Sequence, residues 1–247
     1  MMSIDSSIEW TQATWNPVTG CRKISAGCKH CYAEKMAYRL ERMGSARYAN
    51  GFDPTLHDDL VDLPRSWRTP RTIFVNSMSD LFQAEVPLEF IQRVFKTMAE
   101  TPRHTYQVLT KRADRLAQLA PELCWPENVW MGVSVESTRV MDRVTFLAST
   151  PAKVRFISAE PLLEGLPNLP LQGIHWVIVG GESGPGARPM EESWAQDLLQ
   201  QCQAAGVAFF FKQWGGVIKS RRGRTLLGQT WDELPRVAAV RDAVAAK

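Results

Sequence analysis

Six short apolar runs recur along the chain, and each is rich in β-branched and aromatic residues. They lie at residues 71–77, 105–110, 129–135, 154–160, 175–181 and 207–213. Runs of this length and composition are typical of strands buried on both faces, as in parallel sheets. We expect one more strand, the first in the chain, near Ile8–Trp15.

Helical periodicity occupies several of the gaps between these runs. Three segments show it most clearly, at residues 88–98, 137–147 and 194–205. Each repeats apolar residues three or four positions apart, which places them along one face of a helix. Ser137 suits the N-cap of the second helix, and Gly206 is placed to end the third.

The alternation of strand and helix is the signature of a fold built from βα units. The exception is residues 161–173, where three prolines and two glycines predict a loop in place of a helix. The pattern therefore predicts an α/β protein, a partial (β/α)6-7 TIM-like barrel with parallel strands and outer helices. Because a closed barrel takes eight units, we also expect a gap at one side. We assign the barrel to residues 1–231, and residues 232–247 to a C-terminal tail or short helix.

Polar side chains follow each of the six predicted strands at the point where it ends. In a β/α barrel these loops build the active site. Any one of the residues could instead cap a turn or a helix, but their repetition favours a shared site. We expect seven of them to line one cavity and to bind a cofactor there: Ser77, Asp80, Ser134, Glu136, Ser158, Glu160 and Glu182.

Composition and charge fit a globular protein and narrow its setting. The 247 residues are 45% hydrophobic and 22% charged, which suits one domain. No apolar run approaches the roughly 20 residues that cross a bilayer, and the start lacks a signal-peptide pattern. We therefore expect a cytoplasmic protein with no membrane partner. The net charge of +3 permits a nucleic-acid partner without arguing for one.

The five cysteines point to metal or redox chemistry. Their number is odd, and Cys21, Cys28 and Cys31 lie within eleven residues, so a disulfide framework is a poor explanation. The three form a C-x6-C-x2-C motif in which Gly20 and Gly27 let the backbone bend around a metal centre. Three thiolates on a four-iron cluster leave one iron free, and an open coordination position is typical of a catalytic metal site.

A helix is expected to begin near His30, with Tyr32, Met36, Leu40 and Met43 along one face. Its start would supply backbone N–H donors and a favourable dipole to an anionic cluster. Spacing alone also leaves open a zinc site made by the three cysteines with His30 or His57.

Several motifs together resemble known families. WNPVTGC, GCKHCYAE, FVNSMSDLF, LTKR, GVSVE, SAEPLL, VIVGGESGPGARP and FFKQWGG are similar to a phage-associated three-cysteine-motif family of uncharacterised proteins. The cysteine motif resembles that of the radical S-adenosylmethionine superfamily, and the CYAE stretch is similar to that in spore photoproduct lyase, a DNA-repair member. Two features depart from the superfamily pattern: the first spacing is six rather than three, and His30 stands where an aromatic residue is usual.

The resemblance implies a 4Fe-4S cluster held by the three cysteines and S-adenosylmethionine as its co-substrate. It also implies an electron-donor protein, because the cluster must be reduced before it can cleave S-adenosylmethionine to a deoxyadenosyl radical. By superfamily analogy, Ser77, Ser79 or Asp80 meets the methionine amine, and Ser134 or Glu136 meets the ribose.

The substrate stays open, and we hypothesise a nucleic acid. The basic stretch at residues 219–224, with Lys219, Arg221, Arg222 and Arg224, would contact phosphates near the gap in the barrel. The alternative function is a zinc- or redox-cysteine nucleic-acid-binding protein without catalysis. The glycine-rich run at 180–189, with Arg188, fits a ligand loop or a tight structural turn equally well.

Overall fold

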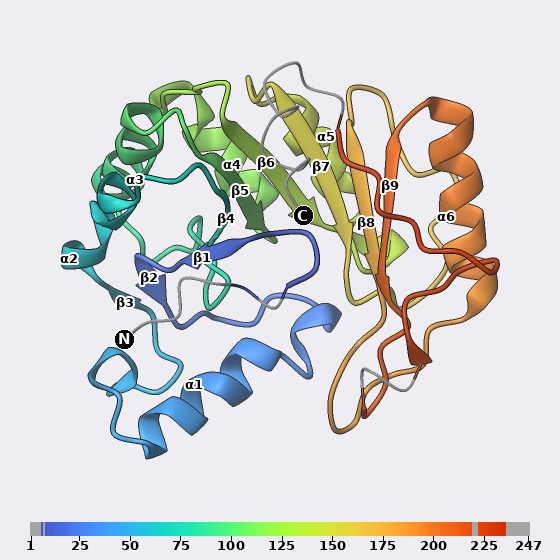
Figure 1. Ribbon diagram of the computed structural model, residues 1–247, viewed down its shortest axis with the longest axis horizontal. Coiled ribbons are helices and arrows are strands. Elements are labelled where there is room, and N and C mark those ends of the chain that lie inside the picture. Colours follow the sequence, from blue (N-terminus) through green and yellow to red (C-terminus); the bar gives the residue numbers. More distant parts are fainter. Residues whose placement is uncertain (1–5, 7, 219–221, 236–247) are drawn as a thin grey trace.

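The computed structural model describes residue 6 and residues 8–218 and 222–235 (Figure 1). Its strands are β1 (Ala13–Trp15), β2 (Val18–Thr19), β3 (Thr55–Leu56), β4 (Thr72–Val75), β5 (Thr105–Thr110), β6 (Val129–Ser134), β7 (Val154–Ala159), β8 (Trp176–Gly180) and β9 (Ala208–Gln213). Its α-helices are α1 (Tyr32–Arg42), α2 (Asp58–Val61), α3 (Leu88–Glu100), α4 (Ala113–Leu119), α5 (Asp142–Ala148) and α6 (Glu192–Ala205).

Seven of the strands form one parallel sheet in the order β1-β4-β5-β6-β7-β8-β9. The sheet curls into a half-barrel, with α3, α4, α5 and α6 on its outer side and α1 below its lower edge (Figure 1). The predicted partial α/β barrel is therefore confirmed. Since β1 and β9 do not pair, the barrel is open between these two edge strands.

The apolar runs locate the strands closely, and β5 coincides with its run from residue 105 to 110. Helix α6 ends at Gly206, which takes a left-handed φ of +65° as a C-cap glycine should. Ser137 instead precedes a short 3-10 turn at Thr138–Val140, and α5 begins only at Asp142. Residues 161–173 contain no helix, as their prolines predict.

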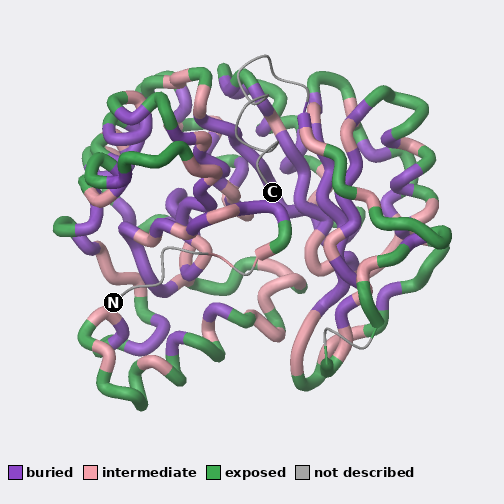
Figure 2. The backbone as a smooth tube through the Cα atoms, viewed as in Figure 1, coloured by how far each residue is buried: buried purple, intermediate pink, exposed green. Residues whose placement is uncertain are grey.

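Alternate strand residues serve two different cores, both buried in Figure 2. Side chains on the outer face, such as Ile73 and Val108, pack with the helices in the larger core. Those on the inner face are mostly aromatic and fill the barrel interior, where Trp176 is central: Trp10, Trp130, Phe156 and Phe210 all stand within 6.2 Å of it, centroid to centroid. Strands buried on both faces explain why their sequences read as continuous apolar runs.

The open side of the barrel is partly covered. Ile8 and Leu234 pack against the inner aromatic core. The segment 231–233 runs beside the free edge of β9: Phe211 N donates to the Trp231 carbonyl at 2.9 Å, and Glu233 N donates to the Phe209 carbonyl at 3.2 Å. The final part of the predicted tail, residues 236–247, lies outside the described residues. No described helix is both long and apolar enough to span a membrane.

Candidate functional site

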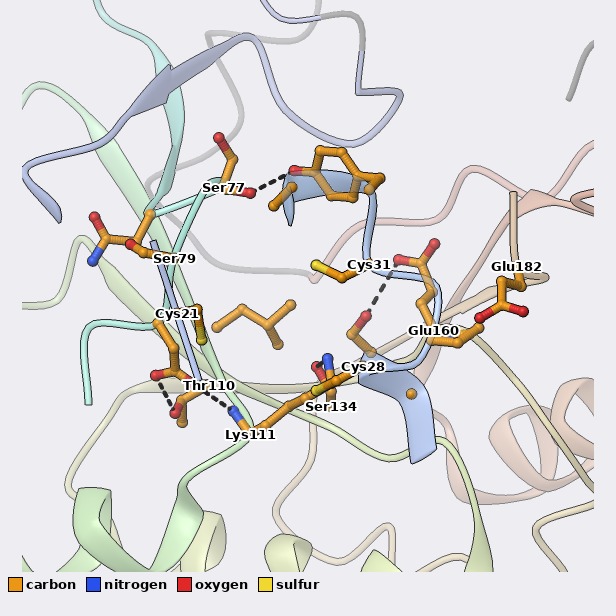
Figure 3. A pocket seen from close by; sticks show the side chains of 18 of the residues that line it. Cys21, Cys28, Cys31, Ser77, Ser79, Thr110, Lys111, Ser134, Glu160 and Glu182 are labelled. Carbon is orange, nitrogen blue, oxygen red and sulfur yellow. Dashed lines mark hydrogen bonds between the residues drawn. The ribbon is translucent and has the colours of Figure 1, made fainter. Parts of the chain in front are cut away.

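A cavity of about 470 Å³ opens at the C-terminal ends of the strands. This volume falls within the range of small-molecule sites. Its walls bring together the three cysteines and six of the seven strand-end residues predicted to share a site: Ser77, Asp80, Ser134, Ser158, Glu160 and Glu182. In Figure 3 the side chains of Cys21, Cys28 and Cys31 approach this pocket from different directions. Its floor is apolar and includes Trp10, Phe74 and Leu109.

The cysteine segment is fastened to the loop after β4 and to the turn at Phe52. Gly20 N donates to the Met78 carbonyl at 3.1 Å, and Cys21 N donates to the Phe52 carbonyl at 3.0 Å. At the other end, the Tyr32 hydroxyl donates to the Ser77 carbonyl at 2.5 Å (Figure 3). A segment held by backbone hydrogen bonds at one end and by a side-chain hydroxyl at the other presents its thiols in a fixed arrangement, which a bound group needs.

Gly20 and Gly27, the two glycines of the motif, are needed for different structural reasons. Gly20 has a φ of +76°, and a Cβ built there would lie 2.2 Å from the carbonyl oxygen of Asp53. At Gly27 an added Cβ would meet the carboxyl carbon of Glu136 at 3.0 Å. Gly20 therefore serves a left-handed turn, whereas Gly27 allows a close approach between the cysteine loop and the end of β6.

Helix α1 begins directly after Cys31, which occupies its N-cap position. Its backbone N–H groups at that end lack intrahelical partners, so they face the site with a partial positive charge. The helix packs through Ala33 and Ala37, while Tyr32, Met36 and Met43 on its apolar stripe are exposed. The amphipathic pattern thus located the helix without identifying the face that is buried.

All three cysteines are free thiols and are partly exposed to the cavity. Burial raises the pKa of the Cys21 thiol to about 11, Asp80 adds to the rise, and Arg112 opposes it. A metal that binds Cys21 must therefore displace a proton at neutral pH.

Asp80 organises this side of the cavity. Its Oδ1 accepts from the Thr110 hydroxyl at 2.7 Å and from Phe82 N at 3.0 Å. Its Oδ2 accepts from Lys111 N at 3.0 Å and from the Arg112 guanidinium at 2.9 Å. A carboxylate has about four acceptor positions. Asp80 uses all of them on the protein, so it holds neighbouring groups in place and has no lone pair left for a ligand amine.

Two lysines reach the cavity from the ends of β5 and β9. Lys111 Nζ donates to the Ser134 hydroxyl at 3.0 Å (Figure 3). Lys212 Nζ lies 2.9 Å from Glu160 Oε1, and the Ser158 hydroxyl donates to Glu160 Oε2 at 3.2 Å. Within the described chain Lys111 forms no ion pair at contact distance, although its charge acts on the buried Glu136, so its ammonium is placed to meet an anionic ligand in the cavity.

Glu136, the seventh predicted residue, is fully buried and lies outside the cavity wall. Its carboxylate accepts from Gly27 N at 3.2 Å and from Arg143 Nη1 at 2.9 Å. Burial would raise its pKa, but Lys111, Ser25, Arg143 and Gly27 together hold the pKa below its usual value. Glu136 therefore anchors the cysteine loop. We had predicted that it lines the cavity, but it does not, because its side chain turns toward Arg143 in α5.

Glu182 pairs with Arg188, whose backbone N and Nε each donate to Glu182 Oε2 at 2.9 Å. Arg188 Nη2 also donates to the Ala26 carbonyl in the cysteine loop at 3.0 Å. These contacts favour the structural interpretation of the glycine-rich run: it closes on itself and braces the loop between Cys21 and Cys28.

The zinc interpretation required a histidine near the cysteines. His57 is buried away from the cavity wall, with Nε2 at 2.8 Å from the Thr19 hydroxyl, whereas His30 lines the cavity. Over residues 8–218 and 222–235, no three His, Cys, Asp or Glu side chains gather closely enough to hold a single metal ion.

Sequence reasoning did not select three cationic residues of the cavity wall, Lys111, Arg112 and Lys212. The signal was present, because all three follow β5 or lie at the end of β9. Of the basic stretch proposed for phosphate binding, Arg224 pairs with Asp232 and stacks over Phe210 at 5.1 Å. Lys219 and Arg221 lie outside the described residues.

The family described as "Protein of unknown function (DUF5131)" matches residues 5–235. The chain belongs to this family. No curated protein matches its sequence. A solved spore photoproduct lyase mutant with bound AdoMet and dinucleoside spore photoproduct is 12% identical, with a TM-score of 0.45 over 72% of this chain and 58% of that chain. The lyase complexed with dinucleoside spore photoproduct is 12% identical, with a TM-score of 0.47 over 81% and 64%.

The chain thus spans about three fifths of the length of these lyase chains. At this level of similarity the likeness concerns the arrangement of strands and says nothing of ligands or chemistry.

Proposed function

We propose that this protein is an iron-sulfur enzyme that binds a 4Fe-4S cluster through Cys21, Cys28 and Cys31 and cleaves S-adenosylmethionine reductively. The observation that carries the proposal is the meeting of three free thiols with strand-end polar residues in one cavity. A site that only stabilised the fold would need neither an open cavity beside the metal nor an array of polar groups around it.

The donor set fits such a cluster. Three thiols with no disulfide supply three iron ligands and leave the fourth iron open. Arg112 and the unpaired N–H groups at the start of α1 complement the negative charge of the thiolates. When bound, the cluster would pass one electron to the sulfonium of S-adenosylmethionine, whose C5′–S bond breaks to give methionine and a 5′-deoxyadenosyl radical.

The remaining residues bind and orient. Lys111 is the cation placed to meet the carboxylate of S-adenosylmethionine, because it lines the cavity and forms no ion pair in the described chain, although its charge also acts on the buried Glu136. Ser77, Ser134, Ser158 and Glu160 offer hydrogen bonds to its amino and ribose groups. The apolar floor excludes water from below, which a radical reaction requires.

Glu182 and Asp80 support the site from behind. The Glu182 carboxylate pairs with Arg188 and the Asp80 carboxylate with Arg112, so we assign both to positioning rather than to ligand contact. The substrate class remains our prediction of a nucleic acid, and the required reductant is an electron-donor protein.

The test is anaerobic incubation of the reconstituted, dithionite-reduced protein with S-adenosylmethionine, followed by detection of 5′-deoxyadenosine and methionine. We expect the wild type to form the two products in a 1:1 ratio. C124A should form as much of each as the wild type does, because Cys124 is exposed and lies outside the cavity. C31A should yield neither. Absence of 5′-deoxyadenosine from a wild-type protein that holds its cluster and binds S-adenosylmethionine would contradict the proposal.

A further inference from the structure

Arg112 is the residue that joins the cysteine motif to the strand ends. It lies two residues after the end of β5, and its side chain is 11% exposed. Nη1 lies 2.9 Å from Asp80 Oδ2 and 3.6 Å from Cys21 Sγ, and Nη2 donates to the Arg22 carbonyl at 2.8 Å. One guanidinium thus holds both the sulfur and the backbone next to it.

The orientation of this guanidinium is fixed by its surroundings. Asp80 is buried, and its other three hydrogen bonds come from Thr110, Phe82 and Lys111. A carboxylate held at four points cannot turn away, so the arginine that it binds keeps an N–H directed at Cys21.

The three cysteines are not equivalent in this respect. Among the described residues, the sulfur of Cys28 has one hydrogen-bond partner, the Ser25 hydroxyl at 3.9 Å. In the ranges that the structure describes, no lysine or arginine donates a hydrogen bond to the sulfur of Cys28 or Cys31. The charged donor therefore acts at a single corner of the cysteine set, beside Cys21.

Hydrogen bonds to the sulfur ligands and nearby charge set the reduction potential of an iron-sulfur cluster. A cation that bonds a thiolate stabilises the reduced cluster more than the oxidised one, because the reduced form carries one more negative charge. On the basis of the proposed function, we propose that Arg112, oriented by Asp80, raises the reduction potential of the cluster through its bond to Cys21. It is a positioning and tuning residue, and its effect is on the cluster rather than on S-adenosylmethionine.

The test is a redox titration of the reconstituted holoprotein without S-adenosylmethionine, followed by the electron paramagnetic resonance signal of the reduced cluster. For R112M we expect the ratio of reduced to oxidised cluster at a fixed potential to fall about tenfold, which is ~59 mV for a one-electron couple. The reduction potential of R112K should lie between those of R112M and the wild type, since a lysine keeps the charge without the forked geometry.

The matched control is R22M. Arg22 is adjacent to Cys21 and carries the same charge, but its side chain is 58% exposed and pairs with Asp53 and Glu85. Solvent screens such a charge, so R22M should stay close to the wild type.

A potential for R112M equal to that of the wild type would overturn the proposal. So would an equal shift in R22M, because net charge rather than the bond to Cys21 would then be responsible. Loss of the cluster from both R112M and R112K would also overturn it, since Arg112 would then be needed for assembly. A wild-type protein that binds no cluster would instead refute the proposed function. The iron content of the wild type therefore distinguishes failure of the proposed function from failure of the Arg112 proposal.

Discussion

Lys111 gives the most specific prediction at the scale of single residues. Its ammonium donates to the Ser134 hydroxyl and forms no ion pair in the described chain. Hydrogen bonds to charged groups contribute about 1.5–3 kcal/mol, so K111M should weaken binding of S-adenosylmethionine by about tenfold or more. Equilibrium dialysis against the reconstituted protein measures this. K153M, which removes an exposed lysine paired with Glu127, should bind as the wild type does, and an unchanged affinity in K111M would refute the assignment.

The sequence located the reactive residues better than it assigned their roles. The short spacing of Cys21, Cys28 and Cys31 was enough to predict that they lie together, because residues so close in sequence must lie close in space. The role of Asp80 could not be derived, since its partners Thr110 and Arg112 come from the next strand end and become visible only in three dimensions. For the same reason nothing in the sequence distinguished Lys111, which faces the cavity, from other lysines after strands.

At the scale of elements, Glu136 ties the end of β6 to α5 and to the cysteine loop. It is fully buried and accepts from Gly27 N and Arg143. E136A would leave Arg143 buried without its partner, which typically costs about 3–5 kcal/mol. We expect the midpoint of urea unfolding of E136A, measured without cofactors, to fall accordingly. The midpoint of E136Q should fall less, because the glutamine keeps an acceptor for Gly27 N. Equal stability of E136A and wild type would show that the buried pair does not hold the loop.

Most of the sheet could be predicted because its strands are buried on both faces. Their apolar runs are therefore continuous and sharply bounded, as at β5 and β6. Helix α1 was harder, because it packs through Ala33 and Ala37 and leaves its larger apolar residues exposed. Periodicity reports which residues share a face, but tertiary contacts decide whether that face is covered.

At the scale of the whole molecule, burial of histidines predicts a pH dependence of stability. Burial lowers the pKa values of His57, His104 and His175 below the ordinary value of about 6.5. The unfolded chain therefore takes up protons first as pH falls, so stability is complete above about pH 6.5 and is lost below it, down through the folded-state pKa values.

Thermal unfolding of the protein without cofactors should accordingly show a lower Tm at about pH 5.5 than at pH 7.5. H104Q should reduce this dependence, because a glutamine amide can still donate to the Pro64 and Trp67 carbonyls that face His104 Nε2. A Tm that does not change over this range would show that these histidines do not control acid stability.

Within the barrel, the inner aromatic core lies directly beneath the site and forms part of its floor. Aromatic side chains around Trp176 fill the lower part, and the cavity occupies the strand ends above them. The gap expected at one side of the barrel lies between β1 and β9 in the strand order, but Ile8 and Leu234 pack against the inner core. Access from the open end, past the cysteine loop, therefore fits the described residues better than access from the side.

We propose above all that Cys21, Cys28 and Cys31 hold a four-iron cluster. The most direct test is the iron and acid-labile sulfide content of the protein after anaerobic reconstitution, measured on the wild type and on a variant with all three cysteines replaced by alanine. We expect about four iron and four sulfide per chain in the wild type and neither in the variant. One zinc per chain with no sulfide, or an iron content that the variant retains, would show that the three cysteines do not hold such a cluster.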